Sequence, residues 1–389
     1  FQNPLFQKNQ KKISRVGRSS SQSNKQLPPP SPSSLPSSVL KSIQKGAFWK
    51  AIPSLKTFLK AHPRHKEGRF FYLQSLLFAR EKEQAKKFFS AVKDLAKWKQ
   101  DMLRAHLLLN AYPSEDLAKI ESLIKQTSLK IADPEILHKK NFKAYYLYLQ
   151  GTFWQQKKDF QKAMDCYKEA LKLLPQHHIY LNNVFYLFFS RLNLYQQAYQ
   201  FCLSQEEHFS NSFLLHLLRG TVLLKLGRFP QAEKALRRAY LLSQNINNKN
   251  TLRMKGWMLQ IYYSYGKSLV FLKQYSQARK FFRMCKAAYS SYKLSAYYWI
   301  AQTYFREGKP GLAVKELEAS IKAGPAIGNF QQLAVGYLML KKVSSAIKVL
   351  EMGLRHFPKS EDLLLLLGEV YFQLHNVSMA KNCFEKAYI

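Results

Sequence analysis

The side chains that could perform catalysis or hold a metal are scattered along this 389-residue chain rather than grouped in motifs. Metal sites and nucleophile–base pairs need His, Cys, Asp and Glu at characteristic spacings. The histidines, among them His62, His65, His177, His178 and His216, combine with no Cys, Asp or Glu at such a spacing. Phosphate-binding glycine loops, nucleophile elbows and paired-carboxylate motifs do not occur either. We therefore expect no enzymatic activity, no metal, no cofactor and no small-molecule substrate.

The cysteines lack the paired spacing of zinc and redox sites. They are Cys166, Cys202, Cys285 and Cys383. Isolated cysteines usually behave as small core residues. We expect four core thiols, which indicate neither an oxidising nor a reducing compartment.

The composition does favour one kind of chemistry, the binding of an acidic partner. Lysine and arginine total 61 against 24 aspartate and glutamate, which gives a net charge of +37. Residues 1–66 hold thirteen of the basic residues and residues 234–306 hold fourteen, and neither range contains an acidic residue. A surplus of this size attracts anionic surfaces. Three partners suit it: an anionic membrane, a nucleic acid and an acidic protein.

The elements that must position these residues repeat along the chain. Ten alanines recur at intervals of 33–35 residues, apart from two intervals of 45 and 46 residues. They are Ala51, Ala85, Ala118, Ala163, Ala198, Ala232, Ala278, Ala313, Ala346 and Ala380. A period near 34 indicates an array in which one helical unit occurs about ten times.

This unit resembles the tetratricopeptide repeat, a pair of helices joined by a turn. Around Ala163, Gly151 and Trp154 of a first helix are followed by Tyr167 of a second helix and by Pro175. In this family small residues lie where the two helices cross, large residues fill the space between units, and the proline ends the second helix. The resemblance implies an all-α solenoid of about ten helix–turn–helix repeats that form a right-handed superhelix.

The pattern divides the chain into three parts. Residues 1–36 are basic and rich in serine and proline, so we predict a disordered tail or tether. Residues 37–143 read as divergent repeats that lack the crossing glycine. Residues 144–389 read as a regular array that ends without a capping helix, and solenoids need such a cap over the last apolar face.

Local departures from the pattern carry further predictions. Tyr186 stands where a small crossing residue is expected, which predicts splayed helices in that unit. The two long intervals predict insertions near residues 133–141 and 244–250 that form loops or lengthen helices. The pentatricopeptide repeat, which reads RNA bases one unit at a time, is the alternative of similar length. Helix-stopping prolines after the second helices favour the tetratricopeptide type.

In tetratricopeptide proteins the first helices line a concave groove, and the resemblance names the residues that would face it. These are Tyr148, Thr152, Asn183, Thr221, Tyr263, Lys267, Tyr298 and Gln302. Tyrosine and amide groups on successive repeats suit an extended peptide or a partner helix. The carboxylate clamp of the family is not expected, because only Asn183 and Lys267 have the required types and they lie more than two repeats apart.

Second helices form the convex surface in this family, and most basic residues of the range 234–306 fall on or beside them. The predicted basic surface consists of Arg237, Arg238, Lys249, Arg253, Lys255, Arg279, Lys280, Arg283 and Lys286. Arginine alternates with aromatic residues at 279–283, as in some nucleic-acid patches, but Phe281 and Phe282 fit core positions better.

We therefore predict a non-enzymatic scaffold for protein–protein interactions, a structural subunit or adaptor of a multi-subunit assembly, with membrane association as one option. Its basic surface would contact an acidic partner. Two alternatives stand beside it: an RNA-associated adaptor, and a peptide receptor in a chaperone or secretion pathway. No apolar run is long enough to span a bilayer. The location stays open between the cytoplasm, a membrane surface and, if a signal or anchor precedes Phe1, the cell envelope.

Overall fold

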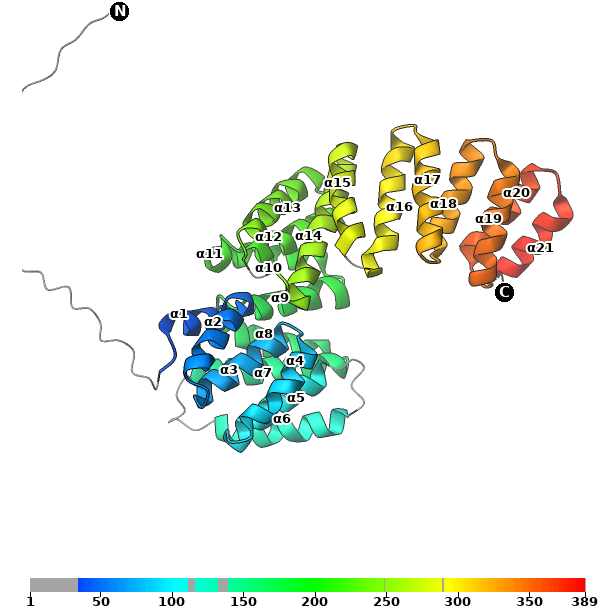
Figure 1. The fold of residues 1–389 in the computed structure, drawn as a ribbon. Helices are drawn as coiled ribbons and strands as arrows, with labels where there is room; N and C mark the ends of the chain where they lie inside the picture. The colour runs from blue at the N-terminus through cyan, green and yellow to red at the C-terminus, as the bar shows by residue number, and fades with distance from the viewer. Residues whose placement is uncertain (1–33, 111–115, 132–138, 248, 289, 389) are drawn as a thin grey trace, which may run out of the picture.

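The computed structural model describes residues 34–110, 116–131, 139–247, 249–288 and 290–388. Within these ranges the regular elements are all helical, and the helices follow one another as ten antiparallel pairs (Figure 1). Most of the predicted tether at 1–36, and residues 133–138 of the first predicted insertion, lie outside the described residues. The all-α solenoid expected from the repeat is confirmed.

The helix pairs have the following bounds. The first three are α1 (Ser37–Gln44) with α2 (Phe48–Ala61), α3 (Lys66–Phe78) with α4 (Lys82–Phe89), and α5 (Lys97–Leu109) with α6 (Leu117–Ile131). The next three are α7 (Lys139–Gln156) with α8 (Phe160–Leu173), α9 (His178–Tyr186) with α10 (Tyr195–Ser204), and α12 (Phe213–Lys225) with α13 (Phe229–Gln244). The last four are α14 (Leu252–Phe271) with α15 (Tyr275–Ala288), α16 (Ser290–Arg306) with α17 (Pro310–Ala323), α18 (Ile327–Met339) with α19 (Val343–His356), and α20 (Glu361–Gln373) with α21 (Val377–Tyr388). The short α11 (Glu206–Phe209) precedes α12.

The recurring alanines all lie on second helices, and nine of the ten are at most 2% exposed. Ala118 is the exception, because it is exposed at the start of α6 while Ile120 is fully buried. The prediction that Ala118 marks the helix crossing of the third pair is therefore wrong. A larger β-branched residue takes the buried place there, which is why this unit departs from the pattern.

Small residues at the crossings are required by the packing of each pair. A Cβ atom on Gly266 of α14 would come within 2.8 Å of the Phe282 ring in α15, and one on Gly368 of α20 within 2.6 Å of the Phe384 ring in α21. Real Cβ contacts are not this short, so even alanine would force the helices apart. Gly256, also in α14, has open space around the same position.

The unit with Tyr186 at its crossing departs from regular α-helix. The helix α9 ends at Tyr186 and continues as a π-helical turn over Leu187–Arg191 before α10 begins. A π turn inserts an extra residue per turn and widens the helix. The bulky side chain at the crossing therefore coincides with a local change in helical geometry.

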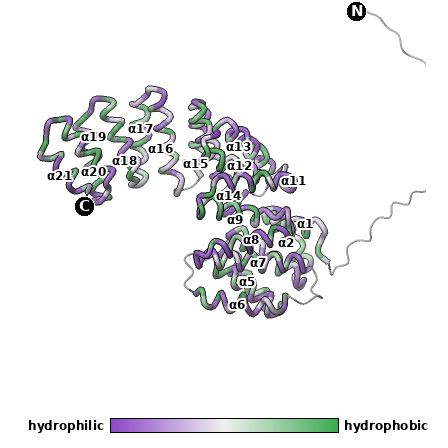
Figure 2. Tube along the Cα trace, turned by 180° about the vertical axis from the view of Figure 1, so that it is seen from behind, coloured by the Kyte–Doolittle hydropathy of each residue, from purple (hydrophilic) through white to green (hydrophobic). Residues whose placement is uncertain are grey.

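The two long intervals lengthen helices and add a loop. The helix α7 has 18 residues and α14 has 20, whereas α12, α18 and α20 have 13 each. A segment without regular structure, residues 245–251 apart from the undescribed residue 248, joins α13 to α14. Along the helices, hydrophobic residues are interspersed with hydrophilic ones (Figure 2).

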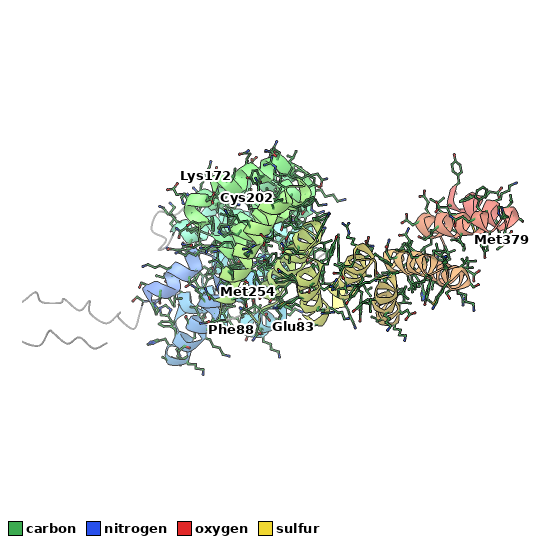
Figure 3. The ribbon with its side chains drawn as sticks, turned by 90° about the horizontal axis from the view of Figure 1, so that it is seen from above. Glu83, Phe88, Lys172, Cys202, Met254 and Met379 are labelled. Atoms are coloured by element: carbon green, nitrogen blue, oxygen red, sulfur yellow. The ribbon has the colours of Figure 1, made fainter. Side chains whose placement is uncertain are left out.

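The first two thirds of the solenoid closes on itself. The backbone N–H of Arg253 at the start of α14 donates to the carbonyl of Ala79 at 3.2 Å, and its guanidinium Nε donates to the carbonyl of Phe78. The neighbouring N–H of Leu252 donates to Glu81 at 3.0 Å, across 171 positions of the chain. We call α1 to α13 with the start of α14 the N-terminal coil, and the rest of α14 to α21 the C-terminal arm. In Figure 3 Met254 of α14 lies in the same region as Phe88 and Glu83 of α4, while Met379 marks the far end of the arm.

Candidate partner-binding face

First helices lie next to one another along the solenoid. The helix α12 contacts α14, α14 contacts α16, α16 contacts α18, and α18 contacts α20, while each second helix packs between first helices. From α12 to α20 the first helices therefore form one row, as the resemblance predicts, and α3, α5 and α7 form another. Whether that face can receive a partner depends on what covers it.

Inside the N-terminal coil the inner face is filled by the protein's own side chains. Tyr148 is 4% exposed, and its ring packs against Phe78, His106 and Tyr180. The prediction that Tyr148 faces an open groove is therefore wrong. The physical reason is the closure of the coil, which brings rings from α3, α5 and α9 against Tyr148 of α7.

The polar groove residues predicted for the coil serve internal hydrogen bonds. The hydroxyl of Thr152 donates to the carbonyl of Tyr148 at 2.9 Å and accepts from the Tyr167 hydroxyl at 3.0 Å. The hydroxyl of Thr221 donates to the carbonyl of Leu217 at 2.8 Å, within α12. Asn183 of α9 is half-buried. All three side chains are half-buried, and Thr152 and Thr221 each donate to a carbonyl of their own helix.

The C-terminal arm presents a different surface, with three half-buried side chains at its centre. The indole N–H of Trp299 in α16 donates to the hydroxyl of Tyr263 in α14 at 2.9 Å. The ammonium of Lys267, one turn after Tyr263, lies 5.0 Å from the Trp299 ring centroid and 5.7 Å from that of Tyr263. Cations over aromatic faces are attracted by the ring quadrupole. We call Tyr263, Lys267 and Trp299 the aromatic–lysine cluster.

The electrostatics of the cluster favour an anionic ligand. Burial lowers the pKa of Lys267, and the neighbouring positive charge of Lys225 lowers it further. Burial raises the pKa of Tyr263. The Lys267 ammonium is partly desolvated and has no carboxylate partner among the described residues, so the opposite charge of a ligand carboxylate would offset the cost of burying it.

Polar and aromatic groups extend the cluster along the arm. The Tyr298 ring lies edge-on to Trp299 at 5.7 Å between centroids. The side-chain amide of Gln302 donates to Gln332 of α18 at 2.6 Å, which links two successive first helices. At the other end, Phe271 closes α14 and is 37% exposed. Four predicted residues, Tyr263, Lys267, Tyr298 and Gln302, thus occupy one surface.

The sequence reasoning missed Trp299, Gln332 and Phe271. Trp299 follows Tyr298 directly, and a register one residue later would have selected it. Gln332 and Phe271 show no signal in the sequence that separates them from other half-exposed helix residues.

Three of the nine predicted basic-surface residues are already paired with acidic residues. Arg237 contacts Glu233 at 2.8 Å, and Lys286 contacts Glu316 at 3.1 Å. Arg279 is held most firmly, because its guanidinium, whose side chain is 11% exposed, lies 2.9 Å from Glu307. These pairs stabilise contacts within or between helix pairs, and their charge is largely neutralised.

Arg253 is not a surface residue either. Its contacts with Phe78 and Ala79 place it at the closure of the coil, and burial, together with the nearby Arg80, lowers its pKa to about 10. Five predicted residues have no acidic partner in the described part of the chain. They are Arg238, Lys249, Lys255, Lys280 and Arg283.

The described residues offer no cluster of three or more His, Cys, Asp or Glu side chains that could hold a metal. Cys202, Cys285 and Cys383 are buried and Cys166 is half-buried. Burial raises the pKa of Cys166 to about 11 and that of Cys285 to about 12, which makes these thiols unreactive. In the same ranges, no helix combines the length and apolarity that crossing a bilayer requires.

Comparisons with known proteins agree with this architecture. Two models of the tetratricopeptide repeat match the chain, one at residues 144–177 and the other at residues 294–326 and 361–388. These ranges correspond to the pairs α7–α8, α16–α17 and α20–α21.

Solved structures of the same fold are also similar. The apo form of the quorum sensor NprR from B. thuringiensis has 12% sequence identity and a TM-score of 0.53, with 83% of this chain and 97% of that one covered. The apo form of RapI has 10% identity and a TM-score of 0.52, with 82% and 95% covered. Identity at this level shows the fold alone. The chain has no significant match among curated protein sequences.

Proposed function

We propose that this chain, a protein of the tetratricopeptide repeat family, is a non-enzymatic scaffold that holds a segment of a protein partner on the first helices of its C-terminal arm. Repeats of this family serve protein–protein interaction or peptide binding. The observation that carries the proposal is the aromatic–lysine cluster. Its side chains are half-buried and keep exposed area for a partner, whereas Tyr148 on the equivalent face of the N-terminal coil is buried.

The cluster has the properties of an interface centre. Aromatic side chains dominate binding energy at protein interfaces because they bury large areas at a low cost in conformational entropy. Trp299 and Tyr263 are held in place by their mutual hydrogen bond, and Lys267 supplies a charge that favours an acidic group next to an apolar one. An extended segment or a partner helix with such a sequence fits this face.

The basic residues that lack acidic partners add a second contact. Arg238, Lys280 and Arg283 are exposed on the second helices α13 and α15. We propose that they contact an acidic region of the partner or of the assembly that contains it. A contact of this kind speeds association and weakens as salt is added.

A pull-down from native extract, run over a salt series with and without nuclease, tests the proposal. Trp299→Ala and Lys267→Ala should each lose the bound proteins at least about tenfold, as expected for an interface centre. Trp154→Ala is the matched control, because Trp154 is also half-buried on a first helix and is also covered by a lysine, Lys162, at 4.5 Å.

Each alternative function has its own outcome in this experiment. Recovery that collapses with nuclease would replace the scaffold by an RNA-associated adaptor. Binding of short peptides that is lost in Tyr263→Ala and Tyr298→Ala, and is insensitive to salt, would favour a peptide receptor. Unchanged recovery in Trp299→Ala would refute the assignment of the face.

A further inference from the structure

A pocket lies away from the candidate face, at the seam where the first helix pair meets the start of α12. Its volume is about 670 Å³, and its walls come from α1, α2, α11, the start of α12 and the end of α13. Ligand pockets in proteins range from roughly 300 to 1,000 Å³. We call this space the seam pocket. It is independent of the aromatic–lysine cluster, which lies on α14 and α16.

Three lysines place positive charge on the seam pocket. Lys41, Lys45 and Lys50 line it, all three are exposed, and none forms an ion pair with another described residue. Glu207 supplies the one acidic side chain on the same wall. The pocket therefore carries a net positive charge that no side chain in the described ranges neutralises.

The start of α12 adds backbone charge on the other wall. Ser212 occupies the N-cap position but makes no side-chain capping bond, and its hydroxyl has no hydrogen-bond partner although the residue is only 7% exposed. The first N–H groups of an uncapped helix carry a partial positive charge and bind anions. Trp49, also on the wall and 5% exposed, has an indole N–H without a partner. Both atoms lie beneath the accessible surface of the wall.

Apolar side chains complete the lining. Phe209 and Phe213 flank the start of α12, and Leu242 and Ile246 come from the end of α13 and the following loop. A site with cations and helix amides at one side and apolar rings at the other matches a ligand with a carboxylate next to a hydrophobic group.

We propose that the seam pocket binds an acidic segment of a partner polypeptide, with a carboxylate between the lysines and the start of α12, and the adjoining apolar side chain against Phe209 and Phe213. A phosphate polymer needs a continuous row of cations to track its backbone, and a bilayer needs an outward-facing basic surface. A recess with one acidic side chain on its rim offers neither. Because the pocket joins helix pairs far apart in sequence, its ligand would also hold the N-terminal coil closed.

The probe is a synthetic pool of hexapeptides with two positions fixed as Asp or Glu and four randomised, together with a pool that carries Asn or Gln at the fixed positions. Each pool is passed over the immobilised full chain, and the retained peptides are quantified by mass spectrometry. The variants are Lys45→Ala/Lys50→Ala for the pocket, Glu207→Gln for its rim, and Lys267→Ala for the separate face. Circular dichroism confirms that each variant is folded.

The expected result is retention of the acidic pool over the neutral pool, with apolar residues enriched beside the acids. Retention should fall at least tenfold in Lys45→Ala/Lys50→Ala, rise in Glu207→Gln, and persist in Lys267→Ala. Equal retention of both pools, or no effect of the double lysine variant, would overturn the proposal. So would loss of acidic-peptide binding only in Lys267→Ala, which would assign it to the candidate face. Lysine-dependent binding of oligouridylate or of phosphatidylserine vesicles without peptide binding would assign the pocket to another class of partner.

Discussion

Acid should unfold the N-terminal coil through two histidines that are buried in their neutral form. His106 is fully buried, and its ring nitrogen shares a hydrogen bond with the Tyr145 hydroxyl at 2.7 Å. Burial, with a smaller contribution from Arg253, lowers the pKa of His106 to about 3. His177 is 2% exposed, and burial holds its pKa well below the ordinary value. Neither ring can accept a second proton without losing its packing.

The size of the stability loss follows from the difference in proton binding between the unfolded and folded states. A histidine in the unfolded chain has a pKa of about 6.5, so below that pH the unfolded state binds protons that the folded state does not. The contribution of these histidines to stability is complete above pH 6.5 and falls as the pH decreases, by up to about 1.4 kcal/mol per pH unit for each residue. At pH 5, His106 and His177 together should reduce the free energy of unfolding by about 4 kcal/mol. This is a large part of the roughly 5–15 kcal/mol that stabilises a typical domain.

Urea unfolding at several pH values between about 7.5 and 5 measures this loss. Tryptophan fluorescence reports the coil through Trp49, Trp98 and Trp154, which lie on α2, α5 and α7. The comparison variant is His106→Asn/His177→Asn, which cannot titrate at these positions. His375→Asn is the control, because His375 is exposed.

The double variant should be less stable than the original chain near neutral pH but should lose less stability between pH 7 and 5, by about 4 kcal/mol. The His375→Asn control should keep the full pH dependence. If the original chain and the double variant show the same slope, the two histidines are not buried and neutral, and the closed packing of the coil around them is wrong.

Three further predictions concern single positions. Gly266→Ala should lower the free energy of unfolding by about 1–3 kcal/mol, because the added Cβ meets a facing phenylalanine ring. Gly256→Ala in the same helix should raise the free energy of unfolding by about 0.5–1 kcal/mol, because its surroundings are open. Urea unfolding distinguishes the two variants, and equal effects would contradict the crossing geometry. Arg279→Ala should lower the free energy of unfolding by about 1–3 kcal/mol, since it breaks a half-buried ion pair with Glu307. The exposed Arg283→Ala should change the free energy of unfolding by less than about 0.5 kcal/mol. Comparable losses of stability in thermal unfolding would show that both side chains are structural. Lys273→Gly should stabilise the chain by up to about 1 kcal/mol, because Lys273 has a φ of 60° that favours glycine; a lower urea midpoint would refute this.

The sequence by itself predicted the repeat and its local packing. Alanine and glycine at fixed places in each unit report contacts between two helices only a dozen residues apart, so a pattern in one stretch of sequence suffices to identify them. The same holds for the stops after second helices: α8, α17 and α19 end two residues before Pro175, Pro325 and Pro358. Ala118 escaped because Ile120 took the buried place, an exchange that the spacing of small residues does not reveal.

The candidate site could be predicted only in part. Tyr263, Lys267, Tyr298 and Gln302 share one surface because neighbouring first helices are adjacent in every solenoid of this family. Trp299 also lies on this surface, because the surface-facing positions of its helix are shifted by one residue from the expected register. That shift depends on how each helix rotates about its axis when it packs.

Whether a groove is open was decided by the tertiary structure alone. Each repeat turns the solenoid by a small angle, and the sum over several repeats, with a π turn and two insertions among them, brings Arg253 onto Phe78, 175 positions away. That closure buries Tyr148 and forms the seam pocket, while the arm beyond it stays open. The sequence determined the unit and its surface chemistry, because these rest on contacts within about one period. The closure determines which surfaces remain open to a partner. It arises from rotations that accumulate over many repeats and that no single repeat encodes.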